Sequence, residues 1–481
     1  MARSHAERRV KRKPKPAPKP KPPRPGNEVR VRMYCQGVGD CYLLSFPAAG
    51  NKTFHMLIDC GVLMGTPGDR DLMKTVVGSV REECRGRLDL VAVTHEHWDH
   101  LSGFVDARGE FEKFNSIDRL WLAWTEDPHD ALAGALREKR ERARARLHAA
   151  LDRMPQGARL GLDRVAEFFG ARGDPERTTT AALDWLRGRV PEARTEYHRP
   201  GGRPRGLPGV EGVRVYVLGP PRDEDFLKHD LATKKEAREH EVYELFLGSF
   251  QEDFFAAALE AGAGGLPPVC PFDLSRAGYR TAEQARQDLF FRGHYFGSDG
   301  DDALAWRRID HDWLGAAEGL ALKLDSDTNN TSLALAIELL PSGRVLLFVG
   351  DAQVGNWQSW HEQTWTVTDE AGKRTVTADE LLARTVLYKV GHHGSHNATL
   401  RKRGLERMTS PELVAMLPVN QEVAHRRGWN RMPLESLVEA LRQRTGGRVL
   451  RSDQKTDPGP YGKRLKVNEN EMFVEYAVPM G

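Results

Sequence analysis

The feature that most constrains the fold is a run of metal-binding side chains at the end of an apolar segment. The run is THEHWDH, residues 94–100, and it directly follows LDLVAV, which predicts a strand. Alternate residues of an extended segment point the same way, so His95 and His97 can reach one metal ion. A turn just after them lets Asp99 and His100 reach a second ion. The pattern therefore predicts the first half of a binuclear metal site.

Later strand ends carry further ligand types. LLFVGD ends an apolar strand with Asp351, an acid in the place that a ligand bridging two ions would need. LYKVGHHGSH ends another strand with His392 and His393, and its glycines let the backbone approach a bound ion or substrate closely. LIDCG places Asp59 at a strand end, where a carboxylate can orient a ligand rather than bind metal. Together these segments favour a metal site over a surface cluster of histidines.

Composition is that of a globular chain with room for one large core or two ordinary ones. The 481 residues are 40% hydrophobic and 29% charged, and no apolar run approaches the roughly 18–20 residues that span a bilayer. The five cysteines are scattered and form no C-x-x-C pair, which suits a reducing compartment. We therefore expect a cytoplasmic protein with no membrane partner.

The N-terminal tail, residues 1–26, carries most of the basic charge. It holds ten of the 71 Lys and Arg and one of the 68 Asp and Glu, so its charge is +9 and the remainder carries −6. Alternating Lys and Pro cannot build a helix or a core, so the tail is predicted to be extended and disordered. It could contact a polyanion such as nucleic acid, or it could be a solubilising extension.

Strand patterns dominate both ends of the body, residues 27–481, and helical patterns fill the middle. Residues 128–152 are strongly helical and charged, and TTTAALDWLRGRV at 178–190 predicts a second helix with a threonine cap. Residues 196–211, rich in Gly, Pro and Arg, predict a loop. The sequence thus predicts an α/β body with a large, mostly helical insertion at about 105–320.

The combination of these motifs resembles the metallo-β-lactamase superfamily of metallohydrolases. The match consists of THEHWDH, LIDCG before it, and the later strand-Gly-Asp and strand-Gly-His-His-Gly segments, and it covers the body apart from the insertion. The resemblance implies an αββα sandwich, two central sheets flanked by helices, with the site along one edge between the sheets. It also implies a ligand set: His95 and His97 for the first ion, Asp99 and His100 for the second, Asp351 as the bridge, and His392 completing the second site.

A closer resemblance is to the soluble nuclease-like domain of the bacterial competence proteins that take up DNA. It is carried by QGVGDCYLL at 36–44, TNNTSLALAIEL at 328–339, YKVGHHGS at 388–395 and ALRQRTGGRVLRSDQ at 440–454. The chain departs from the patterns at two points. The first ion lacks the third histidine that is usual in the superfamily; Asn329 or Asn330 lies in the plausible region, as in the competence-type proteins, and His311 is a further option. Met432 in WNRMP stands where their Tyr-Gly-His-Pro loop has its histidine.

The ligands and the resemblance together predict a binuclear metal-dependent hydrolase that acts as a phosphodiesterase or nuclease. Its cofactors would be two divalent metal ions, zinc or else manganese. Asp99 or His393 could carry the proton to the leaving group. Lys389 could stabilise phosphate charge or be a solvated edge lysine, and Asn330 and Ser395 could line the substrate site.

Two alternatives stay open at the level of the sequence. A small-molecule metallohydrolase, acting on an ester, lactone, lactam or cyclic nucleotide, would use the insertion as a lid. A non-catalytic module would keep only a vestige of the site, which the six intact ligands argue against. The acidic body argues mildly against an extended DNA-binding face, whereas the insertion favours a confined substrate.

Overall fold

The structure is a computed structural model of the chain. It describes residues 27–153, 166–171, 173–239, 241–243, 284, 287–296, 324, 326–369, 372–468 and 470–481. The predicted disordered tail at 1–26 and His311 lie outside these residues. Among the residues that are described, no helix is both long enough and apolar enough to cross a membrane.

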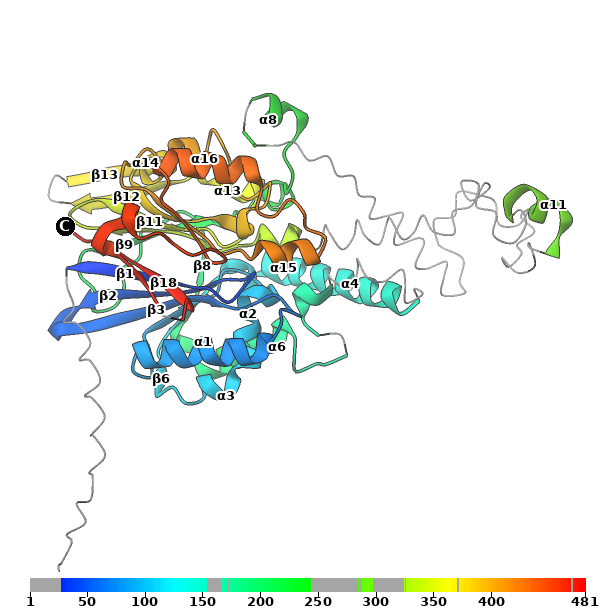
Figure 1. Ribbon diagram of the computed structural model, residues 1–481, viewed down its shortest axis with the longest axis horizontal. Coiled ribbons are helices and arrows are strands. Elements are labelled where there is room, and N and C mark those ends of the chain that lie inside the picture. Colours follow the sequence, from blue (N-terminus) through cyan, green and yellow to red (C-terminus); the bar gives the residue numbers. More distant parts are fainter. Residues whose placement is uncertain are drawn as a thin grey trace, which may run out of the picture.

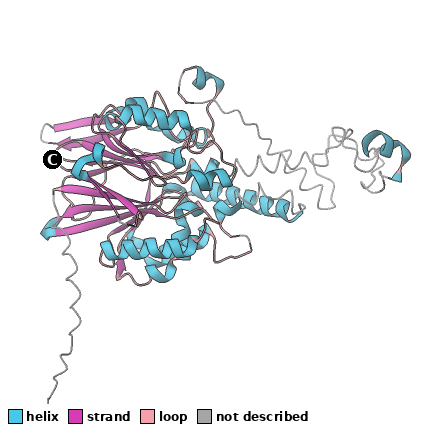
Figure 2. Ribbon diagram, viewed as in Figure 1, coloured by secondary structure: helices cyan, strands magenta, loops and turns pink. Residues whose placement is uncertain are grey.

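Two large sheets form the centre of the molecule, and helices lie outside them (Figure 2). In the described part of the chain the first sheet has eight strands, in the order β17-β18-β1-β2-β3-β5-β7-β8. The second has six, in the order β16-β15-β14-β11-β10-β9. The strands of the first sheet are β1 (Glu28–Tyr34), β2 (Cys41–Ala48), β3 (Lys52–Cys60), β5 (Leu90–Ala92), β7 (Leu120–Ala123), β8 (Thr195–His198), β17 (Leu465–Val467) and β18 (Phe473–Pro479). Those of the second are β9 (Val213–Gly219), β10 (Ala334–Leu339), β11 (Arg344–Phe348), β14 (Thr385–Lys389), β15 (Val414–Leu417) and β16 (Val449–Arg451).

Both sheets are mixed, and their parallel halves carry the predicted ligands. β3, β5, β7 and β8 run parallel to one another, as do β11, β14, β15 and β16. The carboxyl ends of parallel strands meet at one edge of a sheet, where ligands commonly bind. THEHWDH follows β5 at that edge of the first sheet. The Gly-Asp and Gly-His-His-Gly segments follow β11 and β14 at that edge of the second.

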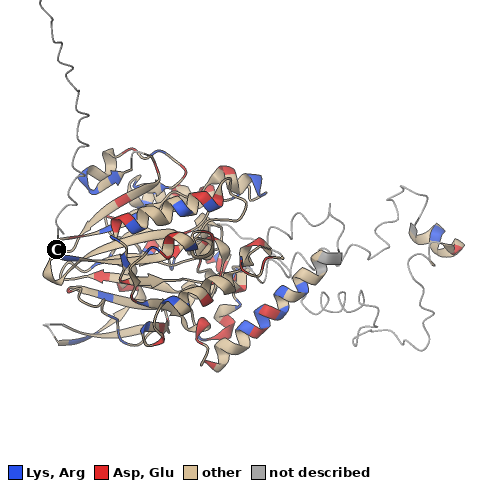
Figure 3. Cartoon of the chain, turned by 90° about the horizontal axis from the view of Figure 1, so that it is seen from below, with Lys and Arg blue, Asp and Glu red and all other residues tan. Residues whose placement is uncertain are grey.

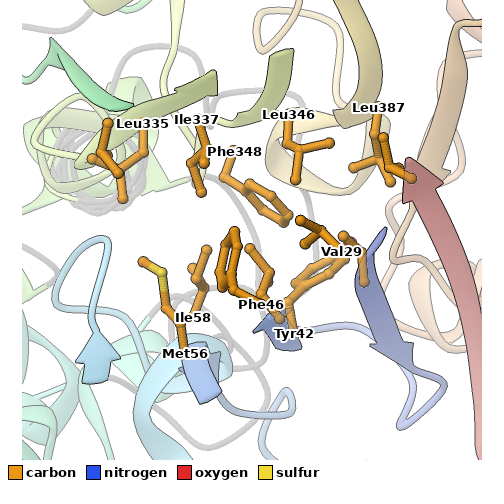
Figure 4. Close-up of a cluster of buried hydrophobic side chains, with 14 of the residues drawn as sticks. Val29, Tyr42, Phe46, Met56, Ile58, Leu335, Ile337, Leu346, Phe348 and Leu387 are labelled. Carbon is orange, nitrogen blue, oxygen red and sulfur yellow. The ribbon is translucent and has the colours of Figure 1, made fainter. Parts of the chain in front are cut away.

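The hydrophobic core lies between the two sheets, and Figure 4 shows side chains of both meeting there. Alternate residues of β10, namely Leu335, Ile337 and Leu339, belong to this inner core. Ala334 and Ala336 belong instead to the cluster under the outer helices. This period of two is the one expected for a strand that is buried on both faces. The packing holds the sheets face to face, and with them the ligands that each sheet carries.

Helices cover the outer face of each sheet (Figure 1). The helices on the first sheet are α1 (Asp69–Glu83), α2 (Trp98–Asp106), α3 (Arg108–Phe111) and α6 (Thr179–Arg189). Those on the second are α13 (Val354–Trp360), α14 (Ala378–Ala383) and α16 (Glu435–Thr445). Further described elements are α4 (Ala131–Arg153), α7 (Glu224–Leu227), α8 (Lys234–Arg238), α11 (Leu289–Phe291) and α15 (Gln421–Arg426), with two small ladders, β4 (Arg87–Leu88) with β6 (Ser116–Ile117) and β12 (Thr364–Asp369) with β13 (Gly372–Thr377). The chain is thus α/β, with two mixed sheets between two helical layers.

The range 105–320, predicted as a helical insertion, is not a unit apart from the sheets in the part of it that is described. It contributes β7 and β8 to the first sheet and β9 to the second. These strands pair with β5 and β10, and β10 lies far away in the sequence. Because helical patterns separate these strands in the sequence, the local pattern does not reveal which strands pair. The strands separate the helices of this range and tie it to both sheets.

Both helices predicted within that range are present. α4 covers most of residues 128–152 and carries Lys, Arg and Glu along its length (Figure 3). α6 begins after Thr178, whose hydroxyl accepts a hydrogen bond from the backbone N–H of Ala181 at 3.1 Å. The predicted threonine cap is therefore confirmed.

Candidate metal centre

The predicted ligands meet where β5, β11 and β14 end. β5 leads into His95 and His97, and α2 begins at Trp98, so Asp99 and His100 lie in its first turn. The loops after β11 and β14 bring the remaining ligands from the second sheet. The side chains buried here, each at most 2% exposed, are His95, His97, Asp99, His100, Asp351 and His393.

Four of these side chains direct their donor atoms into one small space. His393 Nε2 lies 2.9 Å from Asp99 Oδ2 and 3.6 Å from Asp351 Oδ2. His100 Nε2 lies 3.2 Å from Asp351 Oδ2 and 3.8 Å from Asp99 Oδ2. Donors bound at about 2.1 Å around a tetrahedral zinc ion lie about 3.4 Å apart. The set therefore fits one divalent ion.

Each of the two imidazoles is held by its other ring nitrogen. His393 Nδ1 donates to the carbonyl of Pro418 at 2.7 Å, and His100 Nδ1 donates to Asp59 Oδ2 at 2.9 Å. Asp59 also accepts from the backbone N–H and the hydroxyl of Thr94, at 2.8 and 2.7 Å. With Nδ1 donating in this way, Nε2 is the ring nitrogen that faces the shared space, as in metal-binding histidines. Asp59 therefore lies behind His100, on the side of the ring away from the shared space.

The structure groups the two acids with His393, whereas the sequence prediction gave the ligand role to His392. The backbone N–H of His392 donates to Asp351 Oδ1 at 3.1 Å, but its ring is outside the four-residue group. His392 and His393 have φ of 42° and 51°, in the left-handed region that residues other than glycine rarely adopt. Backbone strain of this kind concentrates at functional sites. The geometry therefore favours His393 as the ligand.

His95 and His97 form a second pair of donors beside this group. Nε2 of His95 and Nδ1 of His97 are 3.0 Å apart, which is close enough for both to bind one ion. The ring centroids of His95 and His100 are 4.2 Å apart, so two bound ions would be neighbours. Burial lowers the pKa of His97 to about 4 and that of His95 well below its ordinary value. Both imidazoles are therefore neutral at pH 7, as metal binding requires.

Asn330 and Ser395, predicted to line the substrate site, are engaged elsewhere. The Asn330 amide donates to the carbonyls of Leu227 and His229 at 3.1 and 3.0 Å. Its oxygen accepts from two backbone N–H groups at the start of α13. Asn330 thus ties the segment after α7 to the loop after β11, which is a structural role. Ser395 donates its hydroxyl to Asn397 at 3.2 Å.

Lys389 is buried among carboxylates, because β14 lies between β11 and β15 and not at an edge. Its ammonium lies 2.5 Å from Asp40 Oδ2, 3.2 Å from Asp351 Oδ1 and 2.7 Å from the Gly350 carbonyl. Burial lowers the pKa of Lys389, but the two carboxylates outweigh it and hold the pKa above its ordinary value. Three acceptors use all three ammonium donors. Lys389 therefore orients acids, in place of the predicted phosphate contact or solvated edge position.

Asp40 is the site residue that the sequence prediction missed. Its side chain is 2% exposed, and besides Lys389 it approaches His100, whose Nδ1 lies 3.7 Å from Asp40 Oδ2. Asp40 and Asp59 thus both lie on the Nδ1 side of the His100 ring. The available signal was the Gly-Asp at the end of QGVGD, a polar residue directly before a strand.

Negative charge is in excess in this buried site. The carboxylates of Asp40, Asp59, Asp99 and Asp351 are each at most 2% exposed. The cations that face these four carboxylates are the ammonium of Lys389 and the imidazoles of His100 and His393. Burial lowers the pKa of both imidazoles, but the carboxylates outweigh burial and raise the pKa, which still leaves four negative charges against three positive ones. Buried charge that lacks a counter-charge is costly. The arrangement therefore calls for further cations, and divalent metal ions meet that need.

Two glycines let the chain around Asp40 and Asp59 lie directly against the metal-binding turn. A Cβ on Gly61 would come within 2.4 Å of the backbone carbonyl carbon of Asp99. A Cβ on Gly39 would come within 2.7 Å of the backbone carbonyl oxygen of Asp99. These contacts are with backbone atoms, which cannot move aside as a flexible side chain can.

The Gly61→Ala variant is expected to lower the free energy of unfolding by about 2 kcal/mol and to weaken metal binding, because the added methyl displaces the turn at Asp99. Urea unfolding and metal titration measure the two effects. Gly78→Ala is the matched control, since a Cβ on Gly78 in α1 meets nothing within 4 Å. That change should be neutral or slightly stabilising. Equal behaviour of the two variants would contradict the close packing.

Comparison with known proteins assigns no family. No protein-family model matches the chain, and no curated protein matches its sequence. The structure itself supports an α/β chain with mixed sheets and a buried cluster of histidines and aspartates that could hold metal ions.

Proposed function

We propose that the protein is a metal-dependent hydrolase of the metallo-β-lactamase superfamily that cleaves phosphodiesters. The observation that carries the proposal is the group of Asp99, His100, Asp351 and His393, in which the measured donor distances run from 2.9 to 3.8 Å. Both sheets contribute to it, so the group exists only in the folded chain. Two sheets between helical layers, with a site at strand ends between them, are also what the superfamily resemblance implies.

Two divalent ions, when bound, would polarise the phosphoryl group and lower the pKa of a water molecule. Nitrogen and oxygen donors at tetrahedral spacing favour zinc, with manganese as the alternative. The proposed ligands are His95 and His97 for the first ion, Asp99, His100 and His393 for the second, and Asp351 between the two.

Asp99 is the proposed proton acceptor. Its Oδ2 contacts His393, whereas its Oδ1 is buried and has no hydrogen-bond partner among the described residues. Burial raises the pKa of Asp99, but the neighbouring His100 and His393 outweigh it, so the pKa lies below its ordinary value. The carboxylate is therefore ionised at neutral pH. Its Oδ1 can accept the proton of the attacking water molecule and pass it to the oxygen of the leaving group.

A small-molecule metallohydrolase is the second candidate, and one group of contacts favours it. The short helix Glu167–Phe169 lies against His97: the rings of Phe168 and Phe169 lie 5.4 and 5.3 Å from the ring of His97. The ring of Trp429 stacks on Phe168 at 5.7 Å. Aromatic side chains beside the ligands narrow access to them, which suits a compact substrate.

Elemental analysis of the purified protein, together with hydrolysis of bis(p-nitrophenyl) phosphate, tests the proposal. About two ions per chain and measurable cleavage are expected, and the His97→Ala variant is expected to lose metal and cleavage together. His425→Ala, at an exposed histidine of α15, is the control and should retain both. Bound metal without phosphodiester cleavage would favour the small-molecule hydrolase. Absence of bound metal from the unaltered protein would contradict the enzyme assignment.

A further inference from the structure

A basic groove lies along the outer side of β9, apart from the metal centre. It encloses about 770 Å³ and is formed by the loop at 202–206, the start of β9 and the β12–β13 hairpin. The lining residues that matter here are Arg203, Arg205, Arg214, Lys373, Thr366 and Thr368.

The charge of this groove is one-sided. Its lining has four basic side chains and, among the described residues, no carboxylate. Arg214 lies 3.7 Å from the buried Glu338, and within the described part of the chain Arg203, Arg205 and Lys373 are exposed and form no ion pair. Three unpaired cations on a body of charge −6 are a local concentration of positive potential. The groove therefore attracts anions.

The loop that carries two of these cations is built to lie on the strand edge. Gly201 and Gly202 both have φ of 76°, a conformation that favours glycine and turns the chain back along β9. Arg205 then forms an isolated bridge with Val215, in which each backbone N–H donates to the other residue's carbonyl at 2.8 Å. The Arg and Gly residues of this loop, which the sequence predicts only as irregular, thus form one wall of the groove.

The hairpin supplies the opposite wall. Alternate side chains of β12 point inward, so Trp365 and Val367 are buried in the cluster under the outer helices. There the ring of Trp365 packs edge-on against that of Tyr216, with 5.7 Å between the centroids. The intervening threonines are exposed, and Lys373 lies opposite Thr368 in the ladder. Hydroxyls therefore stand beside the cations, as in surfaces that bind phosphates.

β9 runs from the groove toward the metal centre. Gly201 N–H donates to the carbonyl of Val217 at 3.1 Å, so the loop starts near the carboxyl end of β9. At that end Gly219 pairs with Ala334, and the preceding Leu333 donates its N–H to the carbonyl of Thr94 at 2.8 Å. Thr94 directly precedes the first ligand. The groove is lined by the first residues of β9, Val213 and Arg214. Since β9 is about 20 Å long, the groove lies at that order of distance from the end of β9 that is near the metal centre.

We propose that this groove binds the sugar–phosphate backbone of a nucleic acid strand, beyond the nucleotides that occupy the metal centre. This rests on the proposed phosphodiesterase function and names a polynucleotide as the substrate class. Cations and hydroxyls contact phosphates, and the described lining has no aromatic side chain on which a base could stack. Binding in the groove is therefore independent of base sequence and sensitive to salt.

Fluorescence anisotropy of a labelled single strand of about 20 nucleotides tests this, with the full chain and EDTA present so that no cleavage occurs. The Arg203→Glu/Arg205→Glu variant is expected to weaken binding about tenfold or more. It should also reduce the slope of log Kd against log salt by about one to two units. The basic tail is identical in all proteins compared, so it does not account for a difference.

Arg70→Glu/Lys74→Glu on α1 is the matched control, because it changes the net charge equally at exposed positions outside the groove. It should bind the strand within about twofold of the unaltered protein. Equal loss in both variants, or binding of heparin without binding of any oligonucleotide, would overturn the proposal.

Hydrolysis of bis(p-nitrophenyl) phosphate separates the groove from the proposed function. This small ester does not reach the groove, so the groove variant should cleave it at the unaltered rate. Oligonucleotide binding that depends on Arg203 and Arg205, in a protein with no phosphodiester cleavage, would leave the groove standing and overturn the phosphodiesterase.

Discussion

The His393→Ala variant should lose the second divalent ion and hydrolyse bis(p-nitrophenyl) phosphate at least about 100-fold more slowly than the unaltered protein. The reason is geometric. His393 Nε2 is the donor that lies 2.9 Å from Asp99 and 3.6 Å from Asp351, and its ring is already fixed by the carbonyl of Pro418. Without the His393 ring, one of the four donors is missing, and the carboxylates of Asp99 and Asp351 have no imidazole between them.

The His392→Ala variant is the matched control, since it removes the same ring from the adjacent residue of the same turn. Its ring is outside the donor group and its backbone contact with Asp351 is retained, so the metal content should be unchanged. Elemental analysis after gel filtration, with the urea midpoint as a check on folding, compares the two variants. Loss of metal from His392→Ala and its retention in His393→Ala would reverse the ligand assignment.

The Lys389→Met variant should lower the free energy of unfolding of the metal-free protein by roughly 3–5 kcal/mol. Methionine fills similar space but has no charge, so Asp40 and Asp351 lose the ammonium that lies 2.5 and 3.2 Å from them. The cost is that of two buried carboxylates without a counter-charge, because the side chain of Lys389 is 1% exposed. Urea unfolding in EDTA measures the loss.

Lys74→Met is the control, because Lys74 makes its ion pair with Asp71 on the exposed surface of α1, where such pairs contribute little. It should change stability by less than about 1 kcal/mol. The Asp40→Asn/Lys389→Met double variant should recover part of the stability, since it removes one of the two orphaned charges. If Lys389→Met unfolds at the same urea concentration as Lys74→Met, Lys389 does not hold the acids.

The first half of the candidate site could be predicted from the sequence because its geometry is local. His95 and His97 lie two residues apart shortly after β5, and Asp99 and His100 lie in the helical turn that follows. A spacing of one or two residues is enough to decide that these side chains converge. The α/β character likewise followed from apolar runs and helical periodicity, each of which is read within a few residues.

The choice between two adjacent histidines could not be made in this way. His392 and His393 have the same chemistry and the same neighbours in sequence. Which of the two rings places a nitrogen among the oxygens of Asp99 and Asp351 is decided by the left-handed backbone of both residues and by the carbonyl of Pro418, which follows β15. That carbonyl reaches the ring only after β14 and β15 have paired.

The sequence by itself determined which side chains could bind metal and that they lie at strand ends. Tertiary structure alone decided which of them meet and which charges surround them. Asp40 joined the site, and Lys389 was buried with it, because the two sheets pack face to face and β14 lies inside its sheet. Strand order depends on pairing between segments far apart in the chain, and no local pattern of residues encodes it.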